Sequence, residues 1–187
     1  MQDIVLEPYG AQVLHLGVGA TSLLTALTAC GSLLAFALAA TLLSRGTDAV
    51  RLAALGAVAG LPAFAMVIFS GPLEAPNLFR AGAFLIGVGG GLFSVGTLTM
   101  AMGLQQGEDA GLALGAWGAV QATAAGGAMA LGGVMRDLLA QNLGALSGYN
   151  GVYLLEILLL VAAWVAMVPL LSRRRITPHI DATSNRR

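Results

Sequence analysis

Long apolar runs separated by short polar breaks dominate the pattern along the chain. A helix needs about 20 apolar residues to cross a bilayer, and five runs are close to this length or longer. They cover residues 22–43, 52–70, 78–103, 112–135 and 149–171. The alternation of apolar and polar residues that is typical of strands is absent from them. The pattern therefore predicts an all-α membrane protein of about five transmembrane helices.

The predicted breaks hold the glycine, proline, asparagine and charged residues that end helices. They lie at residues 44–48, 71–76, 105–109 and 142–148. The segment 1–16 is too short and too charged to span, so we interpret it as the end of a truncated helix or as an interfacial segment. Residues 1–172 then form a single membrane domain, and residues 173–187 form a basic tail.

Composition supports the bilayer as the solvent for this chain. Hydrophobic residues make up 57% of the sequence and charged residues only 10%, whereas soluble domains carry about 25% charged residues. Cys30 is the single cysteine. A disulfide or a cysteine metal cluster within one chain is therefore excluded.

Orientation follows from the arginines, because cytoplasmic loops carry an excess of basic residues. The tail holds five of the nine basic residues, and the break after the first span adds Arg45 and Arg51. Placing both in the cytoplasm leaves only Arg80 and Arg136 outside. We therefore predict a cytoplasmic C-terminus.

Glycines at spacings of three and four residues mark small helix faces, where two helix backbones can approach closely. We predict tight helix packing there, with a groove for a pigment or substrate as the alternative. The residues concerned are Gly87, Gly91, Gly111, Gly115 and Gly118.

Ionisable side chains near or inside spans are costly and are candidates for ligand or partner binding. Asp3 and Glu7 would share a helix face, and together could bind a cation or a proton. Glu156 lies about two turns after Tyr149, with a hydrogen-bonded interfacial carboxylate as the alternative interpretation. The fourth span ends on two further candidates, Arg136 and Asp137, although snorkelling explains an arginine there without a function.

Three other side chains complete the candidates for ligand or partner binding. Gln121 lies in the middle of the fourth span, where an amide usually bonds to a neighbouring helix, and Trp117 precedes it by one turn. His15 could ligate the magnesium of a chlorin through a ring nitrogen, although a lone histidine is more often simply polar.

No pattern in the sequence indicates catalysis. No nucleophile has a base beside it, and there is no nucleotide loop or metal cluster. We expect a protein that is not an enzyme, has no metal or nucleotide site and binds no nucleic acid.

Several segments resemble a known family in the same order along the chain. Residues 2–10 (QDIVLEPYG), 91–98 (GLFSVGTL) and 111–122 (GLALGAWGAVQA) are similar to motifs of the PucC/LhaA family of light-harvesting complex assembly factors. Residues 132–137 (GGVMRD) and 152–156 (VYLLE) follow in the family's order. The resemblance covers nearly the whole chain.

The resemblance implies a branch of the major facilitator superfamily, with this chain corresponding to its helices eight to twelve. It implies a role in phototrophic bacteria, in the inner, intracytoplasmic photosynthetic membrane. The partners would be light-harvesting or reaction-centre polypeptides, and the pigment would be bacteriochlorophyll or a carotenoid.

Three functions remain open from the sequence. The first is a binding and assembly protein for bacteriochlorophyll-containing complexes, and the second is an accessory subunit of such a complex. The third is a half-transporter that pairs with a second chain, supplying the missing N-terminal half, to move a small hydrophobic substrate. Alternating access needs two halves, so we do not expect the chain to transport alone.

Overall fold

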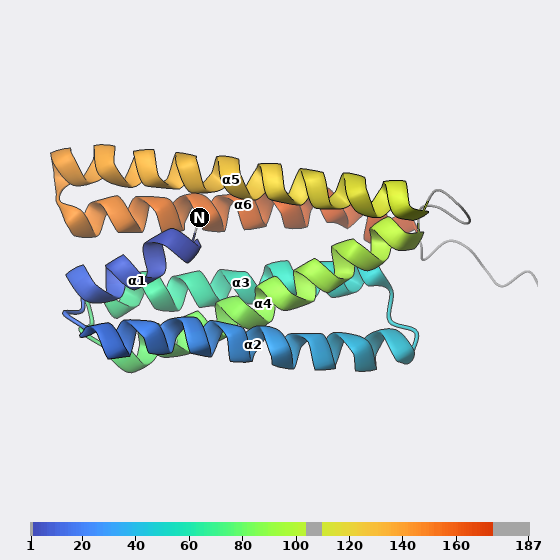
Figure 1. Ribbon diagram of the computed structural model, residues 1–187, viewed down its shortest axis with the longest axis horizontal. Helices are drawn as coiled ribbons and strands as arrows, with labels where there is room; N and C mark the ends of the chain where they lie inside the picture. Colours follow the sequence, from blue (N-terminus) through green and yellow to red (C-terminus); the bar gives the residue numbers. More distant parts are fainter. Residues whose placement is uncertain (1, 104–109, 174–187) are drawn as a thin grey trace, which may run out of the picture.

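The computed structural model describes residues 2–103 and 110–173, which form six α-helices and no strand (Figure 1). The all-α prediction is therefore confirmed. The predicted acidic break 105–109 and the predicted basic tail beyond residue 173 lie outside the described residues. The helices are α1 (Gln2–Gln12), α2 (Val18–Ser44), α3 (Ala49–Ser70), α4 (Pro76–Gly103), α5 (Ala110–Leu143) and α6 (Ala145–Arg173).

The five long helices lie side by side along the longest axis of the molecule (Figure 1). Helix α4 packs against α2 and α3 to form one group, while α5 pairs with α6 and α6 also contacts α3. The short α1 lies between the two groups at one end of the bundle and contacts α2, α5 and α6. Segments far apart in the sequence therefore meet around α1.

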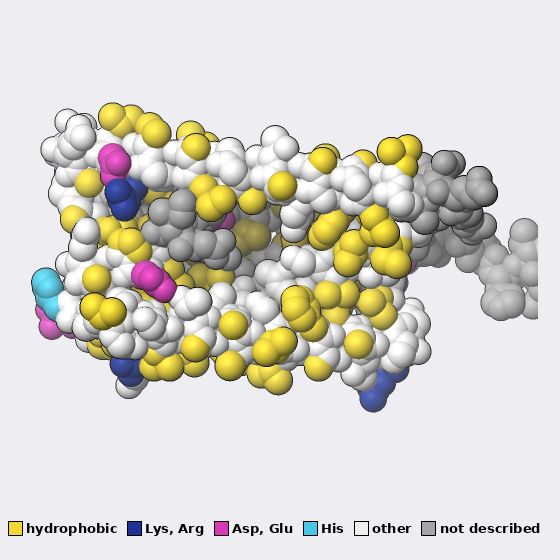
Figure 2. Space-filling model, viewed as in Figure 1, with side chains coloured by type: hydrophobic (Ala, Val, Ile, Leu, Met, Phe, Trp, Pro, Cys, Tyr) yellow, Lys and Arg dark blue, Asp and Glu magenta, His cyan; other side chains and the backbone are white. Residues whose placement is uncertain are grey.

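Four of these helices are long and apolar enough to cross a membrane: α2, α3, α4 and the part Ala145–Leu171 of α6. Large apolar side chains are exposed on α2, α3 and α6, for example Leu33, Leu55 and Leu158, and only 6% of the most apolar stretch of α6 is buried. Figure 2 shows hydrophobic side chains along the whole visible face and basic side chains toward the two ends. Such a surface is stable in lipid and would aggregate in water, so the chain is a membrane protein.

Helix α5 differs from the predicted fourth span. It is 34 residues long and continues well past residue 135, because Arg136 and Asp137 remain helical. It is not among the four helices that meet the length and hydropathy requirement, since glycines and Gln121 dilute its apolar character. The break predicted at 142–148 shrinks to Gly144, whose φ of 89° is the left-handed conformation with which helices commonly end.

The other two described breaks agree with the prediction. The connection from α2 to α3 holds Gly46, with φ of 84°, and ends at Asp48, which caps α3 by accepting a hydrogen bond from the Val50 amide at 2.7 Å. The connection from α3 to α4 is also short and ends before Pro76, the first residue of α4. Proline is favoured at this first position because the amide hydrogen that it lacks would have no partner within the helix, and because its fixed φ suits the helix.

Glycines allow α4 to approach its neighbours, as predicted for two of them. A Cβ atom on Gly87 would overlap the backbone of Thr28 in α2, and one on Gly91 would lie 2.7 Å from the Cβ of Ala35. Real Cβ atoms do not come this close to other heavy atoms, so neither position has room for a side chain. Gly87 and Gly91 therefore both lie where α4 closely approaches α2.

The three glycines of α5 make no such contact among the described residues, so their role in helix packing stays a prediction. A Cβ atom on Gly111, Gly115 or Gly118 would meet nothing within 4 Å among the described residues. Helix α5 contacts α6 with its other side, and this small-residue face points away from the rest of the bundle. The spacing of the glycines predicted a smooth face, but not which neighbour would cover it.

Candidate functional site

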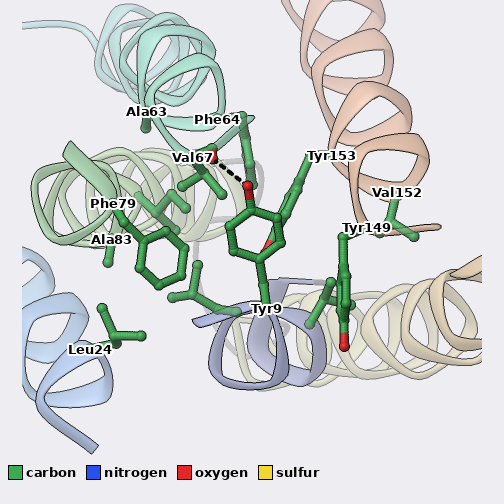
Figure 3. Close-up of a cluster of buried hydrophobic side chains, with 13 residues drawn as sticks. Tyr9, Leu24, Ala63, Phe64, Val67, Phe79, Ala83, Tyr149, Val152 and Tyr153 are labelled. Atoms are coloured by element: carbon green, nitrogen blue, oxygen red, sulfur yellow. Dashed lines mark hydrogen bonds between the residues drawn. The ribbon is translucent and has the colours of Figure 1, made fainter. Parts of the chain in front are cut away.

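Tyr9 of α1 stands at the centre of the largest buried cluster, where α1, α3, α4 and α6 meet (Figure 3). Its side chain is fully buried, and its hydroxyl donates a hydrogen bond to the Val67 carbonyl of α3 at 3.2 Å. Its ring centroid lies 5.3 Å from that of Phe79, 5.5 Å from Tyr149 and 5.6 Å from Tyr153. These separations and tilts are typical of favourable aromatic pairs.

This aromatic cluster fixes the short helix α1 against the two groups of long helices. Sequence reasoning did not single out its tyrosines. The signal was present, because Tyr149 and Tyr153 are four residues apart and so share one face of α6. Tyr153 is completely buried, and its hydroxyl has no hydrogen-bond partner among the described residues.

Glu156 lines a small pocket between α3, α4 and α6. The pocket has a volume of about 110 Å³. Its walls are glycine backbone and apolar side chains: Gly56, Ala57, Gly60, Phe64, Ile86, Gly89, Gly90, Phe93 and Leu160. Most of these glycines are needed for packing, but a Cβ atom on Gly90 would meet nothing within 4 Å in the part of the chain that the structure describes. The absence of a side chain at Gly90 therefore leaves this pocket open instead of serving a helix contact.

The structure corrects the depth of Glu156. The sequence placed it about two turns into its helix, but α6 begins at Ala145, so Glu156 lies about three turns in. The other pocket residues also come from the middle of α3 and α4. Among the acidic residues that the structure describes, Glu156 lies farthest from the ends of its helix. The alternative interpretation, a hydrogen-bonded interfacial carboxylate, is not tested by this position.

Glu7 lies on a second pocket, between α1, α2 and α4. This pocket has a volume of about 290 Å³ and includes the hydroxyl side chains of Thr25, Thr28 and Ser32. The Thr25 hydroxyl donates a hydrogen bond to the Glu7 carboxylate. The Asp3 side chain lies outside the part that the structure describes, so the pairing of the two acids stays a prediction.

His15 is exposed, in the turn between α1 and α2, with a left-handed φ of 51°. It lines neither the Glu156 pocket nor the Glu7 pocket. The structure therefore does not join this candidate magnesium ligand to the other candidate residues.

Arg136 and Asp137 form an ion pair at the end of the bundle where α1 lies. The Arg136 guanidinium donates to Asp137 Oδ1 at 2.6 Å and lies 5.8 Å from the centre of the Tyr149 ring. Tyr149 in turn donates to Gln12 Oε1 at 2.8 Å. The hydrogen bonds to Asp137 raise the pKa of Arg136 above its usual value. Because these contacts connect α5, α6 and α1, their first role is to hold the three helices together.

The two candidates in the middle of α5 line neither the Glu156 pocket nor the Glu7 pocket. Gln121 is exposed and Trp117 is half-buried. Both lie on a helix whose small-residue face has no neighbour in the described part of the chain. No group of three or more histidine, cysteine, aspartate or glutamate side chains is placed to hold a metal ion in the described ranges. The structure thus distributes the predicted residues over several places and builds no single site from them.

Comparison with known proteins identifies a family and several relatives. Residues 1–175 match the model of the family described as PUCC protein. Protein PucC of Rhodovulum sulfidophilum is 50% identical over 156 residues, which are 83% of this chain and 34% of that protein. Protein PucC of Cereibacter sphaeroides is 48% identical over 177 residues, which are 91% of this chain and 38% of that protein.

A third relative, Protein PucC of Rhodobacter capsulatus, is 46% identical over 180 residues, or 92% of this chain and 39% of that protein. No solved structure matches the chain significantly. The chain spans little more than a third of the length of these relatives. With a family model matched over nearly its whole length, this chain belongs to the PUCC protein family.

Proposed function

We propose that the chain is a membrane assembly factor, or an accessory subunit, for bacteriochlorophyll-containing light-harvesting or reaction-centre complexes in a bacterial photosynthetic membrane. The family match over residues 1–175 carries this proposal. The candidate residues of the described structure are dispersed, and we assign the chain no catalytic step. Its role would be to hold partner polypeptides in the bilayer.

The pockets bear on whether the chain itself encloses a pigment. Sites that bury a drug-sized ligand have volumes of about 300–1,000 Å³, whereas the Glu156 pocket measures about 110 Å³. The Glu7 pocket reaches about 290 Å³ but is lined by a carboxylate and hydroxyl groups, with no imidazole. Neither of these two pockets fits a whole chlorin ring. Our proposal concerns protein partners and routes no step through a pigment.

The exposed face of α5 is the surface that best suits a partner helix. Gly111, Gly115 and Gly118 leave room along it for a second backbone, and close backbone approach is a principal source of helix association in lipid. Gln121 is exposed on the same helix and can hydrogen-bond to a neighbouring helix. A helix of an antenna or reaction-centre polypeptide would cover this face.

Purification from a bacteriochlorophyll-producing bacterium tests the proposal. The tagged chain is extracted in a mild detergent, and its partners are identified by mass spectrometry and by an absorption scan. We expect antenna or reaction-centre polypeptides to co-purify. A stable subunit would be found at a fixed ratio in the mature complex, whereas an assembly factor would be found only with incomplete complexes.

Two results would contradict this function. Recovery of the chain alone, without antenna or reaction-centre polypeptides, would remove its basis. Recovery with one other transporter-like chain would favour the half-transporter. This is the competing proposal because the chain matches only 34–39% of the length of its longer relatives.

A further inference from the structure

A groove runs between α3 and α6 at the end of the bundle where α3 begins and α6 ends. It has a volume of about 420 Å³. Its floor is Ala54, whose small side chain packs in the α3–α6 contact, and its sides are Leu55 and Val58 on α3 and Trp164 and Leu171 on α6. The groove therefore lies along the outside of a helix pair that the structure holds firmly together.

One end of the groove is polar and the rest is apolar. Arg51 and Thr47 lie at the start of α3, and Arg51 is exposed. Arg51, Leu55 and Val58 stand four and three residues apart, so they follow one face of α3. Their spacing covers about 10 Å along the helix axis. The groove thus begins with a permanent positive charge at the helix end and continues along apolar side chains toward the middle of the span.

Leu55, Val58 and Trp164 are all strongly exposed, by 51%, 43% and 40%. In a bilayer these side chains contact lipid, whereas the charged end of an arginine near a helix end reaches the membrane interface. Basic pockets between transmembrane helices bind the head groups of anionic lipids. The positive end of the groove therefore suits an anionic head group, and its apolar part suits a hydrocarbon chain of the same molecule.

We infer that this groove binds an anionic phospholipid. Its phosphate pairs with Arg51, and one acyl chain lies along Leu55 and Val58 against Trp164. The arginine fork suits a phosphate because it donates two parallel hydrogen bonds. This site does not depend on the proposed assembly function, because it involves neither α5 nor a protein partner.

Lipid binding by the purified full chain tests the inference. The chain in detergent micelles is titrated with phosphatidylglycerol and, separately, with phosphatidylcholine of the same acyl chains. Native mass spectrometry then measures the bound fraction. We expect about fivefold tighter binding of phosphatidylglycerol, the effect of one arginine near a membrane surface. Arg51→Gln should remove this preference, whereas Arg45→Gln, at the same end but outside the groove, should keep it.

A second pair of variants tests the apolar part. Val58→Phe fills the groove and should weaken binding of both lipids, while Leu38→Phe, an exposed position on α2 outside the groove, should not. Sodium phosphate should not displace the lipid at equal concentration. An unchanged preference in Arg51→Gln, an equal loss in Arg45→Gln, or displacement by free phosphate would overturn the inference.

Discussion

Single residues decide how closely the helices of this protein can approach. Gly87 and Gly90 are three residues apart on α4, yet a Cβ atom on Gly87 would overlap the backbone of Thr28 and one on Gly90 would meet no described atom within 4 Å. The sequence predicts that glycines permit close packing, but only the positions of the other helices show which glycine is needed.

This contrast gives a matched pair of variants. We expect Gly87→Ala to destabilise the protein by about 1–3 kcal/mol, the usual cost of forcing extra volume into a packed contact. Gly90→Ala should leave stability nearly unchanged. Thermal unfolding in detergent, followed by circular dichroism, measures both variants. Equal melting temperatures for the two would show that α2 and α4 are farther apart than described.

Tyr9 provides a second test at the residue scale. Tyr9→Phe removes the hydroxyl that donates to the Val67 carbonyl but keeps the ring within the aromatic cluster. It should therefore cost about 0.5–1.5 kcal/mol, the net value of one hydrogen bond. Tyr9→Ala also removes the ring and should cost about 3–5 kcal/mol, as for other large aromatic truncations. The same unfolding measurement separates the two effects, and a harmless Tyr9→Ala would show that α1 is not anchored by this cluster.

At the scale of elements, α5 departs most from expectation. Its apolar run predicted a helix correctly, but the helix is longer than the predicted span, and its glycines face no neighbour in the described part of the chain. Hydrophobic pattern indicates which segments are helical, because the bilayer requires every backbone group to be satisfied within the helix. It does not indicate which face of a helix meets a partner, since lipid and protein contacts are equally apolar.

Leucine variants of α5 test whether that face meets another protein. Gly115→Leu and Gly118→Leu should leave thermal unfolding of the isolated chain within about 0.5 kcal/mol, because surface substitutions rarely do more. Both should reduce the antenna or reaction-centre polypeptides that co-purify. Leu131→Phe, an exposed change on the same helix, is the control. Full co-purification with both leucine variants would mean that this face contacts lipid only.

At the scale of the whole molecule, the arrangement of charge predicts which end faces the cytoplasm. The connection between α2 and α3 lies at the end of the bundle opposite to the connection between α3 and α4, because α3 joins them across its full length (Figure 1). Arginine bias then places the first connection, with Arg45 and Arg51, in the cytoplasm. The structure contains no membrane, so this orientation stays a prediction.

Single cysteines at the two connections test the orientation. In a Cys30→Ala background, Ser44→Cys should be shielded from an impermeant thiol reagent in intact cells, while Leu73→Cys, which is exposed in the other connection, should be labelled. Permeabilised cells provide the control, since both sites should then react. The reverse pattern in intact cells would invert the predicted topology.

The sequence by itself determined the helices, the membrane environment and the family. Runs of about 20 apolar residues have few folded solutions other than spanning helices, and long motifs in one order identify relatives. Only the tertiary structure decided which residues act together. It gathered Tyr9, Tyr149 and Tyr153 from opposite ends of the chain, placed Glu156 in a pocket lined by glycines, and left Gly115 and Gly118 without a neighbour among the described residues. Local pattern cannot encode such contacts, because they depend on how each helix is rotated against the others.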